Sequence, residues 1–230
     1  MIRARLLPAI LALAALLALA LPAGAAAHQK VTIEEGGGFL GDVGTHLAIH
    51  GDDRNDLVTV IYDPLLDEFL IGHDIEDPIP EGCYRDPNEP FHILHCPARL
   101  INGRIYVYTG VGNDKVVISA KAKDVIVLTR AFLGVGFDSF EGDEEDDEVD
   151  GEEGGDQAKL GGGEDTFKGG KGGDKAFGGA GFDRLFGGAS SDVLYGGPGG
   201  DFLAGGSNRD HCYGGPGKER AVSCEIGFRY

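Results

Sequence analysis

Three short stretches decide the fold of this chain: Gly169-Gly170-Lys171-Gly172-Gly173-Asp174, Gly178-Gly179-Ala180-Gly181-Phe182-Asp183 and Gly196-Gly197-Pro198-Gly199-Gly200-Asp201. The second begins nine residues after the first, and the third begins two such steps later. Each places glycine where a tight turn needs positive φ, and each ends on a carboxylate. The stretches predict a chain of repeated turns, and the nine-residue spacing continues in both directions from them.

An aspartate stands at every ninth position over this part of the chain. The series is Asp138, Asp147, Asp156, Asp165, Asp174, Asp183, Asp192, Asp201 and Asp210. The residue two places after each of them is apolar: Phe140, Val149, Ala158, Phe167, Ala176, Leu185, Leu194, Leu203 and Cys212. Because side chains alternate between the two faces of a strand, this phasing predicts a three-residue strand with one inward side chain in every repeat.

The turns have the chemistry of a calcium site. Tight turns expose backbone carbonyls, each aspartate adds a carboxylate, and Ca²⁺ takes six to eight such oxygens at about 2.3–2.6 Å. A core one residue wide per strand holds a chain weakly, and stacked aspartates repel one another. Calcium between the turns would address both problems, so we expect binding and folding to be coupled.

The pattern resembles the nonapeptide repeat of the RTX, or haemolysin-type, calcium-binding proteins, from about residue 133 to residue 222. The resemblance implies an all-β fold, a right-handed parallel β-roll whose coil takes eighteen residues, two turns and two short strands. Each ion would then lie between a turn and the second turn after it. The implied pairs are Asp165 with Asp183, Asp183 with Asp201, Asp174 with Asp192, and Asp192 with Asp210.

The resemblance also implies the metal ligands. They are the carboxylates of the nine aspartates in the series and turn carbonyls of the regular repeats, among which we single out Gly169, Gly172, Gly178, Gly181, Gly196 and Gly199. The cofactor would be Ca²⁺, with several ions in each chain.

Some repeats depart from the pattern. The turn before Asp147 reads Gly142-Asp143-Glu144-Glu145-Asp146, and Glu152 and Glu153 take the second and third places of the next turn. Ser190 and Asn208 replace the fourth glycine later on. Since residues other than glycine are strained at positive φ, we expect the best sites between Asp165 and Asp201.

Upstream, the stretch Gly110-Val111-Gly112-Asn113-Asp114 fits the motif out of phase, with 24 residues between Asp114 and Asp138. The coil is therefore expected to begin near Gly110 with irregular rungs. Before it, residues 28–108 hold short β-branched and aromatic runs separated by turn residues, which predicts a strand-rich region. The predicted divisions are 1–27, 28–108 and 109–230.

The first division reads as a secretory signal peptide. Arg3 and Arg5 precede the apolar run 6–21, and an alanine-rich exit follows. The alternative is a membrane anchor, but the run is short of the roughly 20 residues of a span and contains Pro8. No later segment has the length and hydropathy of a span. We expect an N-terminal signal helix before cleavage and a secreted, extracellular protein.

Because disulfides form in oxidising compartments outside the cytosol, we expect the four cysteines of an exported chain to form disulfides. They are Cys83, Cys96, Cys212 and Cys224, which allow three connectivities. Two local pairs, Cys83 with Cys96 and Cys212 with Cys224, are the economical choice, and a bridge from Cys212 would close the end of the roll. A zinc site is the alternative, although none of the spacings is Cys-x-x-Cys.

The charge distribution restricts the partners. The chain has a formal net charge of -18, and residues 134–165 hold fourteen Asp and Glu against one basic residue, Lys159. Nucleic acid and anionic lipid would meet a strongly negative surface, so they are disfavoured, whereas cations are favoured. The sequence identifies no protein or cell-surface partner.

Motifs of catalysis are weak. His46 and His50 have the spacing of a metalloprotease helix, but Leu47 stands where the general-base Glu belongs, and the segment alternates like a strand. The sequence has no G-x-S-x-G elbow, and its glycine-rich turns lack the Lys-Ser/Thr ending of a phosphate loop. We therefore predict a calcium-binding protein that is not an enzyme, with a structural or adhesive role.

Two other readings remain. One is a secreted enzyme or toxin with its activity in residues 28–108, for which the roll serves as a calcium-dependent folding or secretion module. The other is a disordered acidic calcium buffer, against which the phased inward apolar residues argue, because a disordered segment has no use for them.

Overall fold

The computed structural model describes residues 30–35, 45–72, 79–87, 93–101, 103–119, 128–218 and 220–224. The predicted signal peptide, 1–27, lies outside these ranges. Within them, no helix has the length and hydropathy of a membrane span.

The described residues form an all-β structure with one short 3₁₀ helix, η1 (Ala98–Leu100). The strands in chain order are β1 (Lys30–Glu35), β2 (Thr45–His50), β3 (Leu57–Asp63), β4 (Glu68–Ile71), β5 (Tyr84–Arg85), β6 (Leu94–Pro97), β7 (Arg104–Tyr108), β8 (Lys115–Ser119), β9 (Leu128–Phe132), β10 (Val135–Gly136), β11 (Ser139–Glu141), β12 (Asp147–Asp150), β13 (Glu153–Gly154), β14 (Gln157–Gly163), β15 (Thr166–Lys171), β16 (Lys175–Gly181), β17 (Arg184–Ala189), β18 (Val193–Tyr195), β19 (Phe202–Ser207), β20 (His211–Tyr213) and β21 (Arg220–Val222).

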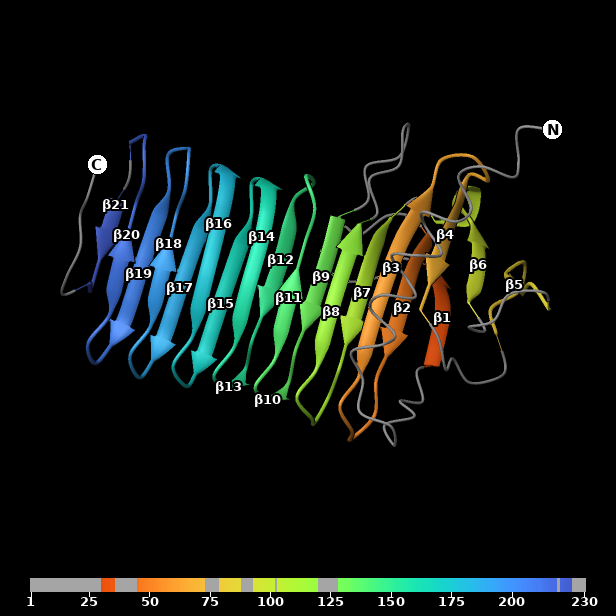
Figure 1. Ribbon diagram of the computed structural model, residues 1–230, viewed down its shortest axis with the longest axis horizontal. Helices are drawn as coiled ribbons and strands as arrows, with labels where there is room; N and C mark the ends of the chain where they lie inside the picture. The colour runs from red at the N-terminus through yellow and green to blue at the C-terminus, as the bar shows by residue number, and fades with distance from the viewer. Residues whose placement is uncertain are drawn as a thin grey trace.

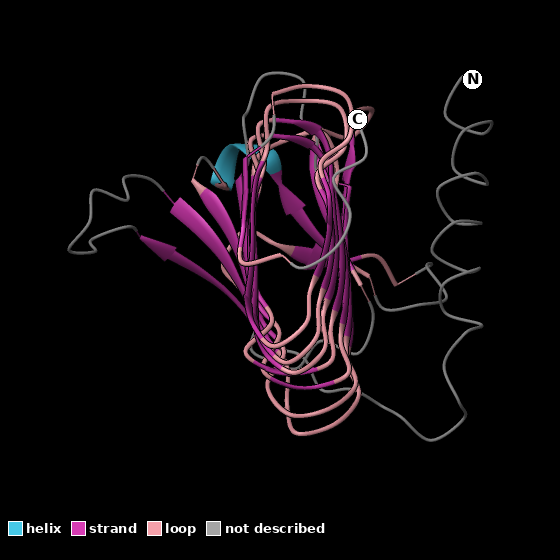
Figure 2. Ribbon diagram, turned by 90° about the vertical axis from the view of Figure 1, so that its left-hand side faces the viewer, coloured by secondary structure: helices cyan, strands magenta, loops and turns pink. Residues whose placement is uncertain are grey.

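The strands lie in two long sheets that face each other. In the described part of the chain, one sheet has eleven strands, with the main order β1-β2-β7-β9-β12-β15-β17-β19-β21. The other has ten, in the order β20-β18-β16-β14-β11-β8-β3-β4-β6-β5. Figure 1 shows the strands side by side along the long axis, and Figure 2, viewed along that axis, shows the two sheets joined by turns at both edges. The long parallel sheets have the architecture of a β-roll.

The nine-residue phasing explains the core. On one sheet Val149 pairs with Phe167, Phe167 with Leu185, and Leu185 with Leu203, all in parallel register and all fully buried. On the other sheet Ala158, Ala176, Leu194 and Cys212 form the matching row. Each inward side chain therefore stacks on its equivalent one coil away, and the two rows fill the space between the sheets.

The coil begins earlier than the expected start near Gly110. β2 already pairs in parallel with β7, and β3 with β8, so strands 45–63 belong to the same two sheets as the repeats. The nine-residue spacing did not predict these strands because long insertions separate the first coils. Residue 47 pairs with residue 105, and residue 105 pairs with residue 129. Strand pairing thus crosses position 108, and the division of the chain there remains a prediction.

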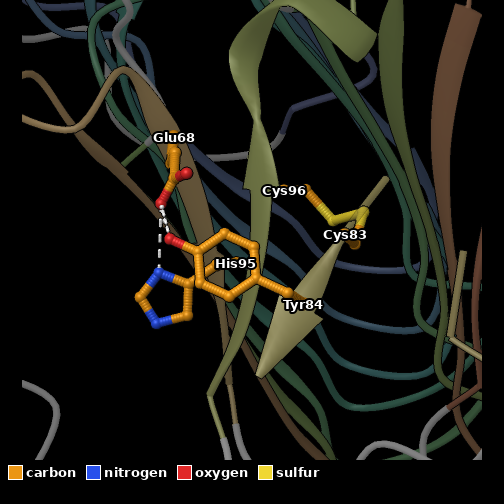
Figure 3. Close-up of a disulfide and its surroundings, with 5 residues drawn as sticks. All are labelled: Glu68, Cys83, Tyr84, His95 and Cys96. Carbon is orange, nitrogen blue, oxygen red and sulfur yellow. Dashed lines mark hydrogen bonds and ion pairs between the residues drawn. A yellow bond between two sulfur atoms is a disulfide. The ribbon is translucent and has the colours of Figure 1, made fainter. Parts of the chain in front are cut away.

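The first insertion leaves the parallel stack as an antiparallel unit. β4 pairs with β3 and β6, and β5 pairs with β6. A disulfide joins Cys83 to Cys96, as the economical pairing predicted. Beside it the Tyr84 hydroxyl donates to Glu68 Oε2 at 2.8 Å, and His95 Nδ1 lies 3.2 Å from the same oxygen (Figure 3).

At the other end of the molecule, the second disulfide joins Cys212 to Cys224. Cys212 occupies an inward position and is 2% exposed, and Cys224 packs against the core from beyond β21. The bridge therefore covers the last core position of the ten-stranded sheet.

The two histidines with metalloprotease spacing lie on strand β2, where the alternation placed them. His46 is buried, and its Nδ1 accepts a hydrogen bond from the Arg104 N–H at 2.8 Å. The His50 ring stacks on Tyr108. Because the segment is a strand, the helical metal-binding arrangement does not form.

Candidate calcium-binding ladders

The nine aspartates of the repeats lie in two columns, one at each edge where the chain passes between the sheets. We call them ladder A and ladder B. Ladder A consists of Asp138, Asp156, Asp174, Asp192 and Asp210, each just before a strand of the ten-stranded sheet. Ladder B consists of Asp147, Asp165, Asp183 and Asp201, each at or just before a strand of the eleven-stranded sheet.

Within each ladder a hydrogen bond joins residues eighteen apart. In ladder A the Asp174 N–H donates to Asp192 Oδ1 at 2.8 Å, and the Asp192 N–H donates to Asp210 Oδ1 at 3.0 Å. In ladder B the Asp165 N–H donates to Asp183 Oδ1 at 3.1 Å, and the Asp183 N–H donates to Asp201 Oδ1 at 3.0 Å. These four pairs are the ones that the RTX resemblance implied, and the same bond extends each ladder toward lower numbers.

In most of these aspartates, the second carboxylate oxygen is buried and accepts no hydrogen bond in the described structure. All nine aspartates are buried, with at most 3% of each exposed. In the described structure, Oδ2 of the following members is buried and accepts no hydrogen bond: Asp138, Asp156, Asp165, Asp174, Asp183, Asp192 and Asp210. A buried carboxylate is costly unless its oxygens are hydrogen-bonded or coordinate a metal, so these oxygens are suited to bind a cation.

In five of these aspartates, a glycine leaves room for Oδ2 to approach a backbone carbonyl of the stacked turn: Asp156, Asp174, Asp183, Asp192 and Asp210. A Cβ placed on Gly169 would overlap both Asp174 Oδ2 and the carbonyl oxygen of Gly187 in the next coil. The same pair of oxygens, from the turn's own aspartate and from the stacked turn, meets Gly178 and Gly196. Each of these glycines therefore leaves a cradle lined by a carboxylate and a carbonyl oxygen.

The other three predicted glycines also face stacked carbonyls. Gly172 lies against the Gly154 oxygen, Gly181 against the Gly163 oxygen, and Gly199 against the Gly181 oxygen. Gly172 and Gly181 have positive φ, at 124° and 149°. A side chain there would have to displace backbone, which explains why glycine recurs at this place in the turn.

The surroundings of the ladder aspartates disfavour the charged form of their carboxyl groups. Burial is the largest cause of the raised pKa of seven ladder carboxyls, and neighbouring carboxylates add to it in all but Asp174. The seven are Asp138, Asp147, Asp156, Asp165, Asp174, Asp183 and Asp192. Burial and the Asp183 charge raise the pKa of Asp165 to about 8, although the Asp147 N–H bond opposes the rise. The pKa of Asp156 rises to about 7 and that of Asp183 to about 6 from the ordinary 3.8. A divalent ion would reverse this balance by favouring the charged form.

The oxygens fit Ca²⁺ better than a metal bound by side chains alone. Within the described ranges, no group of three or more His, Cys, Asp and Glu side chains is arranged to hold a metal ion. The turns of Asp156, Asp174, Asp183, Asp192 and Asp210 each offer one carboxylate with a spare oxygen and a backbone carbonyl of the stacked turn. An all-oxygen set that mixes carboxylates and carbonyls is the set that Ca²⁺ takes.

The irregular repeats carry the backbone strain that their sequences predicted. Glu152, Ser190 and Asn208 adopt positive φ, at 69°, 86° and 81°. In the acidic turn before Asp147, the Asp146 carboxylate accepts a hydrogen bond from the Glu164 N–H at 2.7 Å. This turn therefore stacks on its neighbour through a side chain as well as through its backbone.

A model of the RTX calcium-binding nonapeptide repeat matches the chain in four copies, at residues 132–158, 160–193, 168–203 and 186–218. Residues 132–218 are RTX calcium-binding repeats. The RTX match spans both ladders from end to end, since Asp138 and Asp210 lie inside it. No curated protein and no solved structure matched the chain.

The RTX repeats account for all nine aspartates singled out in the sequence, and the fold brings them together in two columns. Two further buried aspartates, Asp56 and Asp114, were not predicted as ligands. They lie before the RTX match and extend ladder A toward the N-terminus by the same bond between a backbone N–H and Oδ1. Asp114 has a motif in the sequence, Gly-Val-Gly-Asn-Asp, whereas Asp56 has only a glycine five places before it.

Proposed function

We propose that this chain is a secreted calcium ion-binding protein that folds on Ca²⁺ through its RTX repeats. The observation that carries the proposal is a row of buried carboxylates in which Oδ2 accepts no hydrogen bond in the described structure and lies beside a glycine, at Asp156, Asp174, Asp183, Asp192 and Asp210. Calcium ions between stacked turns would supply the missing partner and cancel the repulsion along each ladder.

The proposed ligands are the nine aspartates and turn carbonyls on both sides of each ion. In the regular part, Asp174 and Asp192 would share an ion at one edge, and Asp165 and Asp183 at the other. The ion would supply positive charge between the turns. The residues themselves orient the oxygens, through the N–H bonds that fix Oδ1 and the glycines that leave room for Oδ2.

The proposed export would favour a permanent role for calcium. RTX repeats and disulfides are typical of exported proteins, and calcium is abundant outside cells. The sites of extracellular modules bind at about 10⁻⁴–10⁻³ M, so extracellular calcium would keep the roll folded. In our proposal the chain folds only after it leaves the calcium-poor interior.

We infer a structural or adhesive role, with no catalysis. The two parallel sheets form an elongated stack (Figure 1), a shape that spaces or displays surfaces at a distance. The antiparallel unit at its N-terminal end would then be the displayed part. The enzyme alternative keeps its activity in residues 28–108, where neither the sequence nor the described structure offers an assembled catalytic constellation.

Isothermal titration of the chain with calcium tests the proposal. We expect several ions per chain, a dissociation constant of about 10⁻⁴–10⁻³ M, and no comparable heat with magnesium, which demands octahedral geometry and dehydrates reluctantly. A chain that takes up no calcium in the millimolar range would contradict the proposed function.

A further inference from the structure

Ladder A does not stop where the RTX repeats stop. The Asp114 N–H donates to Asp138 Oδ1 at 2.7 Å, and the Asp56 N–H donates to Asp114 Oδ1 at 2.7 Å. These steps span 24 and 58 residues, in place of the eighteen of the repeats. The bond is nevertheless the one that joins Asp174 to Asp192, so the ladder continues through two rungs that have no periodic sequence.

The strands on either side of these turns explain the continuity. The turn 51–56 runs from β2 to β3, and the turn 109–114 runs from β7 to β8. Both strand pairs are in parallel register, His50 opposite Tyr108 and Leu57 opposite Lys115. The two turns must therefore stack at the same edge of the molecule as the turns of ladder A.

The turn 51–56 has the same glycine cradle as the regular repeats. A Cβ on Gly51 would overlap Asp56 Oδ2 and the carbonyl oxygen of Thr109. Thr109 stands five places before Asp114, as Gly187 stands five places before Asp192 in the regular repeats. The pair of oxygens found in regular repeat turns, such as that of Asp174, is thus present where the sequence has no repeat.

The carboxylates of this pair also have oxygens to spare. Asp56 and Asp114 are each 2% exposed. In the described part of the chain, Asp56 Oδ1 and Asp114 Oδ2 are buried and accept no hydrogen bond. The other oxygen of Asp56, Oδ2, accepts the Asp52 N–H at 2.9 Å. The exposed side of the turn is only partly neutralised, by the ion pair of Arg54 with Asp52.

We propose that the turns 51–56 and 109–114 hold a calcium ion of their own, bound by the Asp56 and Asp114 carboxylates and the Thr109 carbonyl. The site lies outside residues 132–218 and would bind β2 and β3 to the calcium-dependent roll. It rests on the proposed function, since it assumes that ladder A binds calcium. Its consequence is that the strands preceding the repeats fold with them.

Counting bound ions by native mass spectrometry of the full chain at saturating calcium tests the site. We expect Asp56→Asn to carry one ion fewer than the wild type, because the amide keeps the size of the side chain and removes its charge. Asp53→Asn is the matched control, since it removes an exposed charge from the same turn and should leave the count unchanged. Asp174→Asn, inside a regular RTX repeat, should also lower the count.

An Asp56→Asn chain that keeps the wild-type count would overturn the site and leave the proposed function intact. A wild type without any calcium would overturn both. If Asp56→Asn fails to fold, hydrogen exchange of the wild type decides: calcium must slow amide exchange in residues 51–63 and 109–119. Unchanged exchange there, while residues 160–213 become protected, would overturn the site.

Discussion

The backbone N–H of Asp174 donates to Oδ1 of Asp192 at 2.8 Å, eighteen residues further along the chain. One side chain thus fixes the spacing between two turns, while its other oxygen stays buried beside Gly187 without a hydrogen bond in the described structure. Each ladder is therefore held in register by its aspartates and destabilised by their charge. Calcium would remove the second effect and leave the first.

Asp183→Ala should lower the free energy of unfolding and the calcium affinity more than Asp147→Ala. Asp183 lies between regular RTX turns, and its Oδ1 accepts the Asp165 N–H. The residue one coil before Asp147 is Thr129, so an ion there would have no aspartate turn on that side. Loss of the buried acceptor leaves the Asp165 N–H unsatisfied, which costs about 1–3 kcal/mol.

Urea unfolding of the two variants at saturating calcium measures this difference, and a parallel calcium titration reports the lost sites. Equal unfolding midpoints together with equal calcium affinities would show that the regular turns are no better than the acidic one.

Without calcium, the roll should be more stable in mild acid than at alkaline pH. Burial raises the folded-state pKa of Asp165 to about 8 and of Asp156 to about 7, whereas the unfolded chain titrates near 3.8. The folded state therefore binds protons more tightly. Its stability from these groups is full below pH 4 and is lost as the pH rises toward 8.

Far-UV circular dichroism in chelator at pH 5 and pH 8.5 checks the sign, and we expect more β structure at pH 5. With calcium the order reverses, because the ion competes with these protons and binds more tightly at the higher pH. More β structure in chelator at pH 8.5 than at pH 5 would refute this linkage.

Ser190→Gly should stabilise the chain. Ser190 has φ of 86° at a turn position that glycine fills in the regular RTX repeats. Such strain costs about 1–2 kcal/mol for residues with a Cβ, and glycine removes it. Ser191→Gly is the control, because Ser191 is not among the residues at positive φ and glycine there only adds unfolded-state entropy. In calcium, the melting temperature should be higher for Ser190→Gly than for the wild type and slightly lower for Ser191→Gly. A lower melting temperature for Ser190→Gly would disprove the strain argument.

Replacing both Cys212 and Cys224 by alanine should cost about 2–4 kcal/mol, mainly by releasing a constraint on the unfolded chain. Cys212 is also the last buried residue of its row, so its loss opens the core at that end. Urea unfolding in saturating calcium measures the change, with the pair Cys83 and Cys96 left intact. An unchanged urea unfolding midpoint would mean that this disulfide does not stabilise the end of the roll.

Much of the roll could be predicted from the period of nine. Leu185 and Leu203 stack inside because each lies two residues after an aspartate, and alternation in a strand then fixes the face. The pairs Asp165–Asp183 and Asp174–Asp192 followed from the coil length that the RTX resemblance implied. The spacing was enough because nothing is inserted or deleted between Asp138 and Asp210.

The start of the coil could not be predicted in the same way. Residue 47 pairs with residue 105 across an insertion that folds as β4, β5 and β6, so no fixed step links the two rungs. Asp56 has one glycine at the required distance and no second one, which is too weak a signal among 38 acidic residues. Only the stacking of β2 on β7 and of β3 on β8 brings Asp56 to the ladder.

Circular dichroism of the full chain during a calcium titration tests the central claim most directly. We predict that β structure is gained with a midpoint of about 10⁻⁴–10⁻³ M, that it is lost again in chelator, and that Asp183→Ala moves the midpoint to higher calcium. Identical spectra with calcium and with chelator at neutral pH would contradict the claim that this protein folds on calcium.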